Sequence, residues 1–343
     1  MPNARILSLV LDDNGAYLGM EKGCFVLKDR KGNKKKYPVL ENQIKEVVLH
    51  SGNAVSTGAL SSLGFWGVDV VVETARGRPV AMMKAFDDDR HVETRLAQYE
   101  AVKSEKGRNI AKQIVIHKIK TQNRVLENHD LKLLDVEKAV NSIQNIQDEN
   151  INKFRQKLNA IEGVKSREYF SRIYSLVPSD IRPEARKKYR AYDGVNNLFN
   201  LGYEVLQWKV HRALVRANLE PYLGFLHSVQ NGKPSLVCDM EELYRYHVDE
   251  FVLEYVQGLS SKDFIAKDAS AIAPRKGKRI YLNDKKTNHF MKGVKEVFKS
   301  DIKASTIRAG GKKQRLETLV NEEALLLGKY LRNENSVWVP RLA

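Results

Sequence analysis

Three residues of the types that bind metal ions stand close together between residues 222 and 249. His227 ends an apolar stretch, and Asp239 and Glu242 lie three residues apart in the segment that follows. If a helix begins near these carboxylates they share one of its faces, because residues i and i+3 are neighbours on a helix. An imidazole combined with carboxylate oxygens is a ligand set that holds Mg²⁺ or Mn²⁺. The sequence therefore predicts a divalent-metal site in this segment.

The chain also carries a strong positive charge. Its 58 Lys and Arg exceed its 42 Asp and Glu, which gives a formal net charge of +16 over 343 residues. Residues 274–315 hold 14 basic and three acidic residues, a net charge of +11, so the excess is concentrated. This balance favours a polyanionic partner, most simply nucleic acid, over a protein that is merely basic. A metal site on such a chain favours chemistry on a phosphodiester.

Short apolar runs separated by turn residues predict a β-rich region before residue 90. We expect turns at 12–15 and 29–33, and a helix over 54–63. The expected strands are 5–11, 17–27, 44–49, 68–72 and 80–83.

From residue 92 the apolar spacing changes from a period of two to about 3.6 residues, which is typical of amphipathic helices. Asp193 is a suitable N-cap for one of them. The expected helices are 109–126, 131–147, 161–176, 193–217 and 240–258. We therefore predict an α+β protein, with a β-rich N-terminal domain over residues 1–90 and a larger all-α domain over residues 91–343.

Four ordered segments resemble the CRISPR-associated integrase of the adaptation module, the nuclease family that inserts new spacers into a repeat array. One Asp-x-x-Glu alone would be a weak signal, but four motifs in the family's order are specific, and the resemblance covers roughly the whole length. The segments are Glu-Gly at 162–163, the Asp-x-Val-Asn helix at 193–206, Pro-Tyr-Leu-Gly-Phe-Leu-His at 221–227, and Pro-Ser-Leu-x-x-Asp-x-x-Glu-x-x-Arg at 234–245.

The resemblance implies a site, a cofactor and partners. Its metal ligands carry over onto Glu162, His227 and Glu242, with Asp239 as an adjacent essential acid that orients water or completes the coordination shell. The implied cofactor is Mg²⁺ or Mn²⁺. The implied partners are a second copy of the chain through the β-rich domain, a small ferredoxin-like CRISPR adaptation protein, and DNA that is branched or duplex with 3′-hydroxyl ends, including the CRISPR repeat.

The predicted function is that of a metal-dependent DNA endonuclease and integrase, which captures foreign DNA fragments as new spacers by transesterification. Two alternatives stay open: a repair nuclease that acts on branched DNA, and a DNA-binding scaffold without catalysis. No apolar run approaches about 18 residues and no apolar segment follows the first residues, so we expect a cytoplasmic protein without a membrane partner. The two cysteines are far apart, which argues against a structural zinc site.

Each candidate residue also has a structural interpretation. His227 alone would fit a buried core histidine, and Asp239 and Glu242 alone would fit acids that complement a helix dipole. Asn196 and Asn200 fit either a packing role or support of the metal site. The basic residues fit solvated loops or DNA contacts, and we favour contacts. The DNA-contact candidates are Arg182, Arg186, Lys187, Lys188, Arg190, Arg275, Lys276, Lys278 and Arg279.

Overall fold

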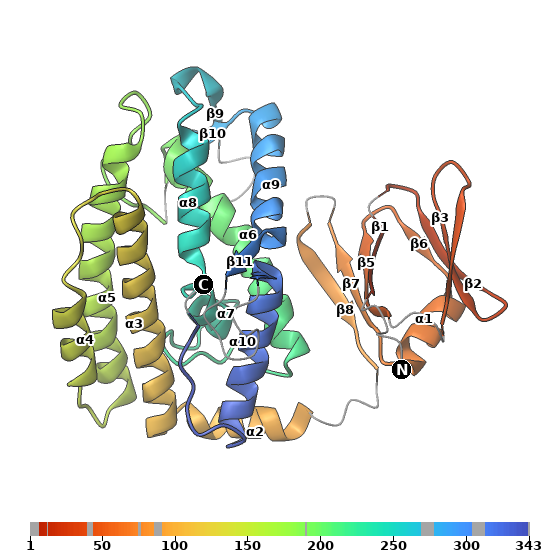
Figure 1. Ribbon diagram of the computed structural model, residues 1–343, viewed down its shortest axis with the longest axis horizontal. Coiled ribbons are helices and arrows are strands. Elements are labelled where there is room, and N and C mark those ends of the chain that lie inside the picture. Colours follow the sequence, from red (N-terminus) through yellow and green to blue (C-terminus); the bar gives the residue numbers. More distant parts are fainter. Residues whose placement is uncertain are drawn as a thin grey trace. The chain divides into compact units, whose positions relative to one another are not determined.

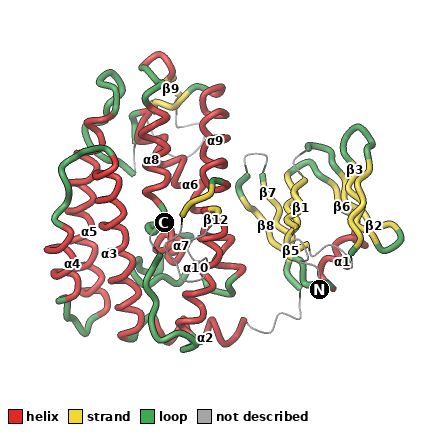
Figure 2. Tube along the Cα trace, viewed as in Figure 1, coloured by secondary structure: helices red, strands yellow, loops and turns green. Residues whose placement is uncertain are grey.

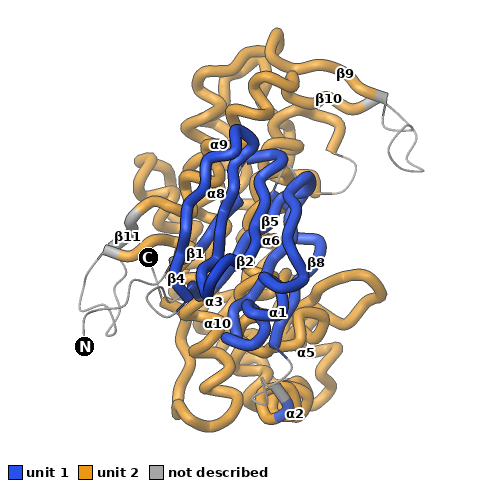
Figure 3. The backbone as a smooth tube through the Cα atoms, turned by 90° about the vertical axis from the view of Figure 1, so that its right-hand side faces the viewer, with its two compact units in different colours: residues 1–92 blue, residues 93–343 orange. Residues whose placement is uncertain are grey.

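The structure is a computed structural model, and it describes residues 7–11, 13–39, 44–74, 77–85, 91–188, 191–268, 278–303 and 313–341. The chain divides into two compact units, Met1–Val92 and Glu93–Ala343, which Figure 3 shows in different colours. The first unit is rich in strands and the second is mostly helical (Figure 1), so the predicted fold class is confirmed. The dimerisation role of the first unit stays a prediction.

The first unit holds two four-stranded sheets and one helix. One sheet has the order β1-β5-β7-β8, with β8 antiparallel to β7 and the other pairs parallel. The other has the order β4-β3-β2-β6. The elements are β1 (Leu7–Leu11), β2 (Tyr17–Glu21), β3 (Cys24–Lys28), β4 (Lys34–Pro38), β5 (Ile44–His50), β6 (Ala54–Val55), α1 (Thr57–Phe65), β7 (Asp69–Glu73) and β8 (Pro79–Met83).

Both sheets and α1 contribute to one apolar core, which includes Leu18, Val47 and Leu63. The single strand predicted over 17–27 is instead a hairpin of β2 and β3. Its two-residue turn, Lys22 and Gly23, has both φ angles positive, as the tight turns that match strand twist require. Only the glycine signals such a turn in the sequence, since a lysine rarely adopts positive φ.

The second unit is built mainly from helices, shown in red in Figure 2. Two short hairpins, β9 with β10 and β11 with β12, interrupt the all-α domain that the sequence predicts. The elements are α2 (His91–Ala101), α3 (Glu105–Asn128), α4 (Val136–Gln144), α5 (Ile151–Ile173), η1 (Tyr174–Leu176), α6 (Gly194–Arg216), α7 (Ser235–Glu241), α8 (Arg245–Val256), η2 (Ser261–Asp263), β9 (Phe264–Asp268), β10 (Lys278–Leu282), α9 (Asp284–Lys299), β11 (Asp301–Lys303), β12 (Lys313–Arg315) and α10 (Leu316–Leu331).

Helix α6 is central in this unit, because it packs against α7, α8, α9 and α10. Its predicted N-cap is confirmed, since the Asp193 carboxylate accepts a hydrogen bond from the backbone N–H of Asn196. Helix α3 packs against α4, α5, α7 and α8. The segments around residues 162 and 242 therefore belong to helices that contact α3, which itself carries residue 118.

The helix predicted over 240–258 is wrong in one respect. The structure has two helices there, α7 and α8, separated by a turn at residues 242–244. Hydrogen bonds of the i to i+3 type span this turn, from the N–H of Leu243 to Met240 and from that of Tyr244 to Glu241. Asp239 therefore lies inside α7 and Glu242 caps its end, which lets the two carboxylates meet different partners.

Among the residues described, no helix is long and apolar enough to cross a membrane.

Candidate metal centre

Two of the predicted metal ligands meet at one ammonium group. Glu162 lies in the middle of α5 and Glu242 caps the end of α7. Lys118 of α3 reaches between them: its Nζ forms an ion pair with Glu162 Oε1 and lies 2.7 Å from Glu242 Oε2. Three helices thus bring two carboxylates from distant parts of the chain to one cationic point.

The charges at this point stabilise one another. Glu242 also pairs with Arg245, at 2.6 Å from Nη1 to Oε1. Burial alone would raise the pKa of Glu242, but the charges of Arg245 and Lys118 lower it to about 2. Burial likewise acts against ionised Glu162, yet Lys118 and a hydrogen bond from Ser166 keep the pKa of this carboxyl below its usual value. Both carboxylates are therefore ionised at neutral pH.

His227 and Asp239 form the second half of the site. The Asp239 side chain is completely buried, and its Oδ2 accepts the backbone N–H groups of Phe225 and Leu226 at 2.6 and 2.9 Å. Its Oδ1 accepts the backbone N–H of His227 at 2.9 Å and contacts His227 Nδ1 at 2.7 Å. A carboxylate accepts hydrogen bonds only, so Nδ1 carries the proton. The other ring nitrogen, Nε2, then has the free electron pair that a metal ion needs.

The segment before His227 is held from two sides. Arg155 of α5, itself buried, donates to the carbonyl of Phe225 at 2.8 Å and to that of Gly224 at 2.9 Å. Asp239 occupies the N–H groups of the same segment, so donors and acceptors of this irregular backbone are both satisfied. The result is a rigid support for the His227 imidazole.

A test of this rigidity is Gly224→Ala. An added Cβ would lie 2.8 Å from Asp239 Oδ2 and from the carbonyl carbon of Ser235, and 2.9 Å from the carbonyl oxygen of His227. Since most of these atoms belong to the backbone, we expect the free energy of unfolding to fall by about 1–3 kcal/mol in urea denaturation.

The matched control for that variant is Gly163→Ala. No atom lies within 4 Å of an added Cβ there, and the position is inside helix α5. Alanine forms helices better than glycine does, so the free energy of unfolding of this variant should rise by about 0.5–1 kcal/mol. Equal effects of the two substitutions would show that the segment at Gly224 is not tightly packed.

Two carboxylates and an imidazole are suitable ligands for a divalent cation, but in this structure their side chains are not arranged around one common point. Within the described part of the chain, no three His, Cys, Asp or Glu side chains are arranged so as to hold a metal ion directly. Lys118 lies between Glu162 and Glu242 instead. Yet both carboxylates face one cation, as ligands of a shared metal ion would.

The hydrogen bonds of Asp239 all lie on the His227 side of the site. Its oxygens accept the backbone N–H groups of residues 225–227 and contact the imidazole, so Asp239 supports His227. Its assignment as a member of the catalytic set stays a prediction.

Two residues of the site were missed in the sequence. Lys118 sits on the apolar face of α3, next to Val115 and Ile119, which are completely buried. A lysine on the buried stripe of an amphipathic helix is unusual unless it is paired, and this pattern could have revealed it. Arg155 had no comparable signal, because its partners are backbone carbonyls about 70 residues away.

A buried carboxyl ties together the helices behind the site. Asp249 of α8 accepts hydrogen bonds from the hydroxyls of Tyr169 on α5, at 2.8 Å, and of Tyr203 on α6. Burial raises the pKa of Asp249 to about 6, although both hydrogen bonds act in the opposite direction. Ionised Asp249 is therefore less favourable in the folded protein than in the unfolded chain.

This shift predicts a pH dependence of stability. A carboxyl whose pKa is raised by folding stabilises the protein fully below its unfolded pKa of about 3.9, and that contribution is lost as the pH rises through about 6. Relative to Asp249→Asn, which cannot ionise, the wild-type free energy of unfolding should fall by roughly 2–3 kcal/mol between pH 4 and pH 7. Urea denaturation of both proteins at each pH measures the difference. A constant difference would mean that Asp249 does not titrate in this range.

In the basic loop before α6, Arg186 is half-buried and the other described cations are exposed. Arg186 donates to Asn196 and Asn200 at 3.0 and 2.7 Å, and its guanidinium lies over three aromatic rings. Asn196 also accepts from Tyr174 and from the backbone N–H of Lys187. These contacts give both asparagines a packing role.

The remaining DNA-contact candidates are less constrained or not described. Arg182 donates to the backbone carbonyls of Ser175 and Val177, and it is exposed like Lys187 and Lys188. Arg279 lies over the Tyr192 ring. Arg190, Arg275 and Lys276, and the side chain of Lys278, lie outside the described residues. Contact with DNA stays a prediction for all nine.

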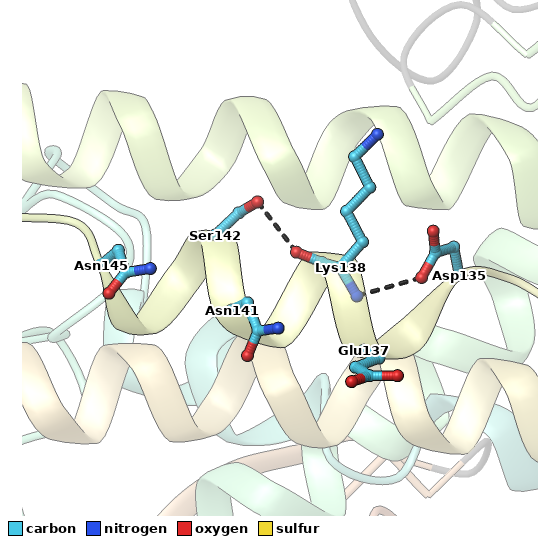
Figure 4. A pocket seen from close by; sticks show the side chains of 6 residues that line it. All are labelled: Asp135, Glu137, Lys138, Asn141, Ser142 and Asn145. Atoms are coloured by element: carbon cyan, nitrogen blue, oxygen red, sulfur yellow. Dashed lines mark hydrogen bonds between the residues drawn. The ribbon is translucent and has the colours of Figure 1, made fainter.

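A shallow pocket lies elsewhere, along α4 (Figure 4). Two of its residues serve the helix itself, since Asp135 caps the N-terminus through the N–H of Lys138 and Ser142 donates to the carbonyl of Lys138. None of its residues belongs to the metal centre. The lining residues are Asp135, Glu137, Lys138, Asn141, Ser142 and Asn145.

Sequence comparison connects this geometry to known proteins. Residues 9–295 match the family described as CRISPR associated protein Cas1. The CRISPR-associated endonuclease Cas1 of Korarchaeum cryptofilum is 28% identical over 275 residues, which are 75% of this chain and 80% of the relative. The CRISPR-associated endonuclease Cas1 1 of Chlorobaculum tepidum is 26% identical over 351 residues, 97% of each protein.

Solved structures share the fold at lower identity. A chain of a partial Cas6-RT-Cas1–Cas2 complex superimposes with a TM-score of 0.74 at 19% identity, over 98% of this chain and 99% of that one. A casposase bound to an integration product gives a TM-score of 0.72 at 18% identity, over 97% of each chain. At this identity the likeness concerns the fold.

Proposed function

This chain belongs to the Cas1 family of CRISPR-associated proteins, and from that premise we propose that it is a metal-dependent endonuclease and DNA integrase of CRISPR adaptation. One observation carries the proposal furthest: Glu162 and Glu242, from helices distant in sequence, bind the same cation. In addition, Nδ1 of the His227 imidazole is held by a carboxylate. This is the donor set and the support that a catalytic Mg²⁺ or Mn²⁺ site requires.

Glu162, Glu242 and His227 Nε2 are the atoms that would hold the ion. When bound there, such an ion would supply stabilisation of negative charge on the phosphoryl oxygens and would lower the pKa of the attacking hydroxyl. In the proposed transesterification, the 3′-oxygen of the incoming strand bonds to a target phosphorus. The bond from that phosphorus to the 3′-oxygen of the neighbouring nucleotide breaks, and this oxygen takes up a proton. Asp239 and Arg155 keep the imidazole in place during the exchange.

The proposed partners follow from relatives. A Cas1 chain of similar fold occurs in a complex with Cas2, and a casposase of similar fold binds an integration product. For this chain we propose a homodimer that binds a small adaptation protein, and DNA duplexes with 3′-hydroxyl ends. The net charge of +16 suits a DNA substrate.

The test is a strand-transfer assay with the purified protein, its small partner, a short duplex with 3′-hydroxyl ends and a supercoiled plasmid that carries a repeat array. We expect joined products with Mg²⁺ or Mn²⁺, none with EDTA, and recovery when metal is added back. Cleavage of branched DNA without joining would favour the repair nuclease. Binding without joining or cleavage would favour the scaffold, in which Lys118 permanently takes the place of the metal.

A further inference from the structure

Lys118 is buried in the position where the proposed metal ligands converge. Its side chain is 9% exposed, and its ammonium contacts carboxylates from two other helices. Transfer of an unpaired ammonium to such a site costs several kcal/mol, so the two carboxylates are what permits Lys118 to lie there. Lys118 in turn permits the two carboxylates to lie close together, because without a cation the two ionised groups would repel each other.

Lys118, Arg245 and the proposed divalent ion would all have to contact the Glu242 carboxylate. Glu242 already contacts two cations, Lys118 on one oxygen and Arg245 on the other. Arg245 also pairs with Glu241 and is fixed over the Tyr203 ring, 4.8 Å from its centroid. Lys118 has a flexible four-carbon stem instead. If a divalent ion binds, Lys118 is therefore the cation that moves.

An acceptor for the displaced ammonium lies one helical turn away. Gln122 follows Lys118 by four residues on α3, so the two side chains share a face. Gln122 is buried, and its Oε1 has no hydrogen-bond partner among the described residues. Its amide nitrogen lies 3.5 Å from Ser166 Oγ, which donates to Glu162. An unpaired buried acceptor is costly, and an ammonium that leaves the carboxylates would satisfy it.

We propose that Lys118 is the internal cation of this centre: it holds Glu162 and Glu242 together in the metal-free protein, leaves them when a divalent ion binds, and thereby sets the metal affinity. This inference rests on the proposed metal site. Lys118 is a positioning residue in this scheme, since it acts through the two ligands. It explains how two ionised carboxylates can lie within reach of one point.

The test compares Mn²⁺ binding by the wild type, Lys118→Met, Lys118→Arg and Lys120→Met. Lys120 is an exposed lysine of the same helix and serves as the matched control. With the competing ammonium removed, Lys118→Met should bind Mn²⁺ at least tenfold more tightly in calorimetry, and should melt at a lower temperature in EDTA. Lys118→Arg should restore the melting temperature and the weaker affinity. Lys120→Met should match the wild type.

Different outcomes separate this inference from the proposed function. If the wild type binds Mn²⁺ and Lys118→Met binds it equally or more weakly, the role of Lys118 is overturned and the metal site stands. If neither protein binds Mn²⁺, both are overturned.

A second measurement needs no stable methionine variant. In wild-type protein labelled with ¹⁵N at lysine Nζ, the Lys118 signal, identified by its loss in Lys118→Arg, should shift when Mg²⁺ is added, and that of Lys120 should not. An unshifted Lys118 signal at saturating Mg²⁺ would overturn the inference.

Discussion

Glu162→Gln is expected to reduce metal-dependent strand transfer by more than about 100-fold. Loss of a residue that only supports a metal ligand typically lowers affinity or activity by about 10–100-fold, and a direct ligand should exceed that range. Glutamine keeps the size of the side chain and an oxygen that can still accept from Lys118 and Ser166, the present partners of Glu162. The fold should therefore survive, with a loss of about 1–2 kcal/mol in the free energy of unfolding, since only a charge is removed.

The control for that variant is Glu168→Gln, on the same helix α5. Glu168 pairs with Lys165 and Arg172 at a partly exposed surface, and such pairs contribute at most about 1 kcal/mol. Its strand transfer should equal that of the wild type. Titration of Mn²⁺ should show weaker binding by Glu162→Gln alone. Unchanged joining by Glu162→Gln would remove this residue from the metal site and would favour a site built on His227 and Glu242 only.

Features of this fold that depend on residues close together in the sequence could be predicted, such as helix caps and the period of apolar residues. Asp193 caps α6 as expected, because an N-cap depends only on the residues of the first turn. The change of apolar period near residue 90 likewise separates strands from helices. The hairpin turn at Lys22 and Gly23 was missed because one of its two positive-φ positions is a lysine.

The interior of the site depends on contacts between distant residues, and no spacing reveals them. The break between α7 and α8 places Glu242 against Lys118 and Arg245, whereas an uninterrupted helix would keep Asp239 and Glu242 on one face. Resemblance supplied the four candidate residues, but not the cation that stands among them. The motifs identified the candidate ligands, whereas Lys118, which neutralises them, could be found only from the packing of α3 against the neighbouring helices.

Asp239→Asn should lower both stability and metal affinity. The carboxylate accepts three backbone N–H groups and the His227 imidazole, and it is completely buried. An asparagine has one acceptor oxygen, so its NH₂ group would face donors that it cannot satisfy. We expect the free energy of unfolding to fall by about 2–4 kcal/mol, because buried donors to a charged acceptor are left unpaired.

The effect on metal binding has a separate cause. The single oxygen of asparagine cannot serve both the 225–226 N–H groups and His227 Nδ1, so the interaction that fixes the tautomer and orientation of the imidazole is weakened, and Mn²⁺ affinity should fall by about 10–100-fold. The control is Asp135→Asn, because among the described residues the Asp135 side chain accepts just the N–H of Lys138, at the start of α4, and asparagine caps a helix equally well. Imidazole ¹⁵N shifts should report a mixture of His227 tautomers in Asp239→Asn and one tautomer in the control. If Asp239→Asn loses stability but binds Mn²⁺ like the wild type, Asp239 serves the fold of the 225–227 segment and not the ligand.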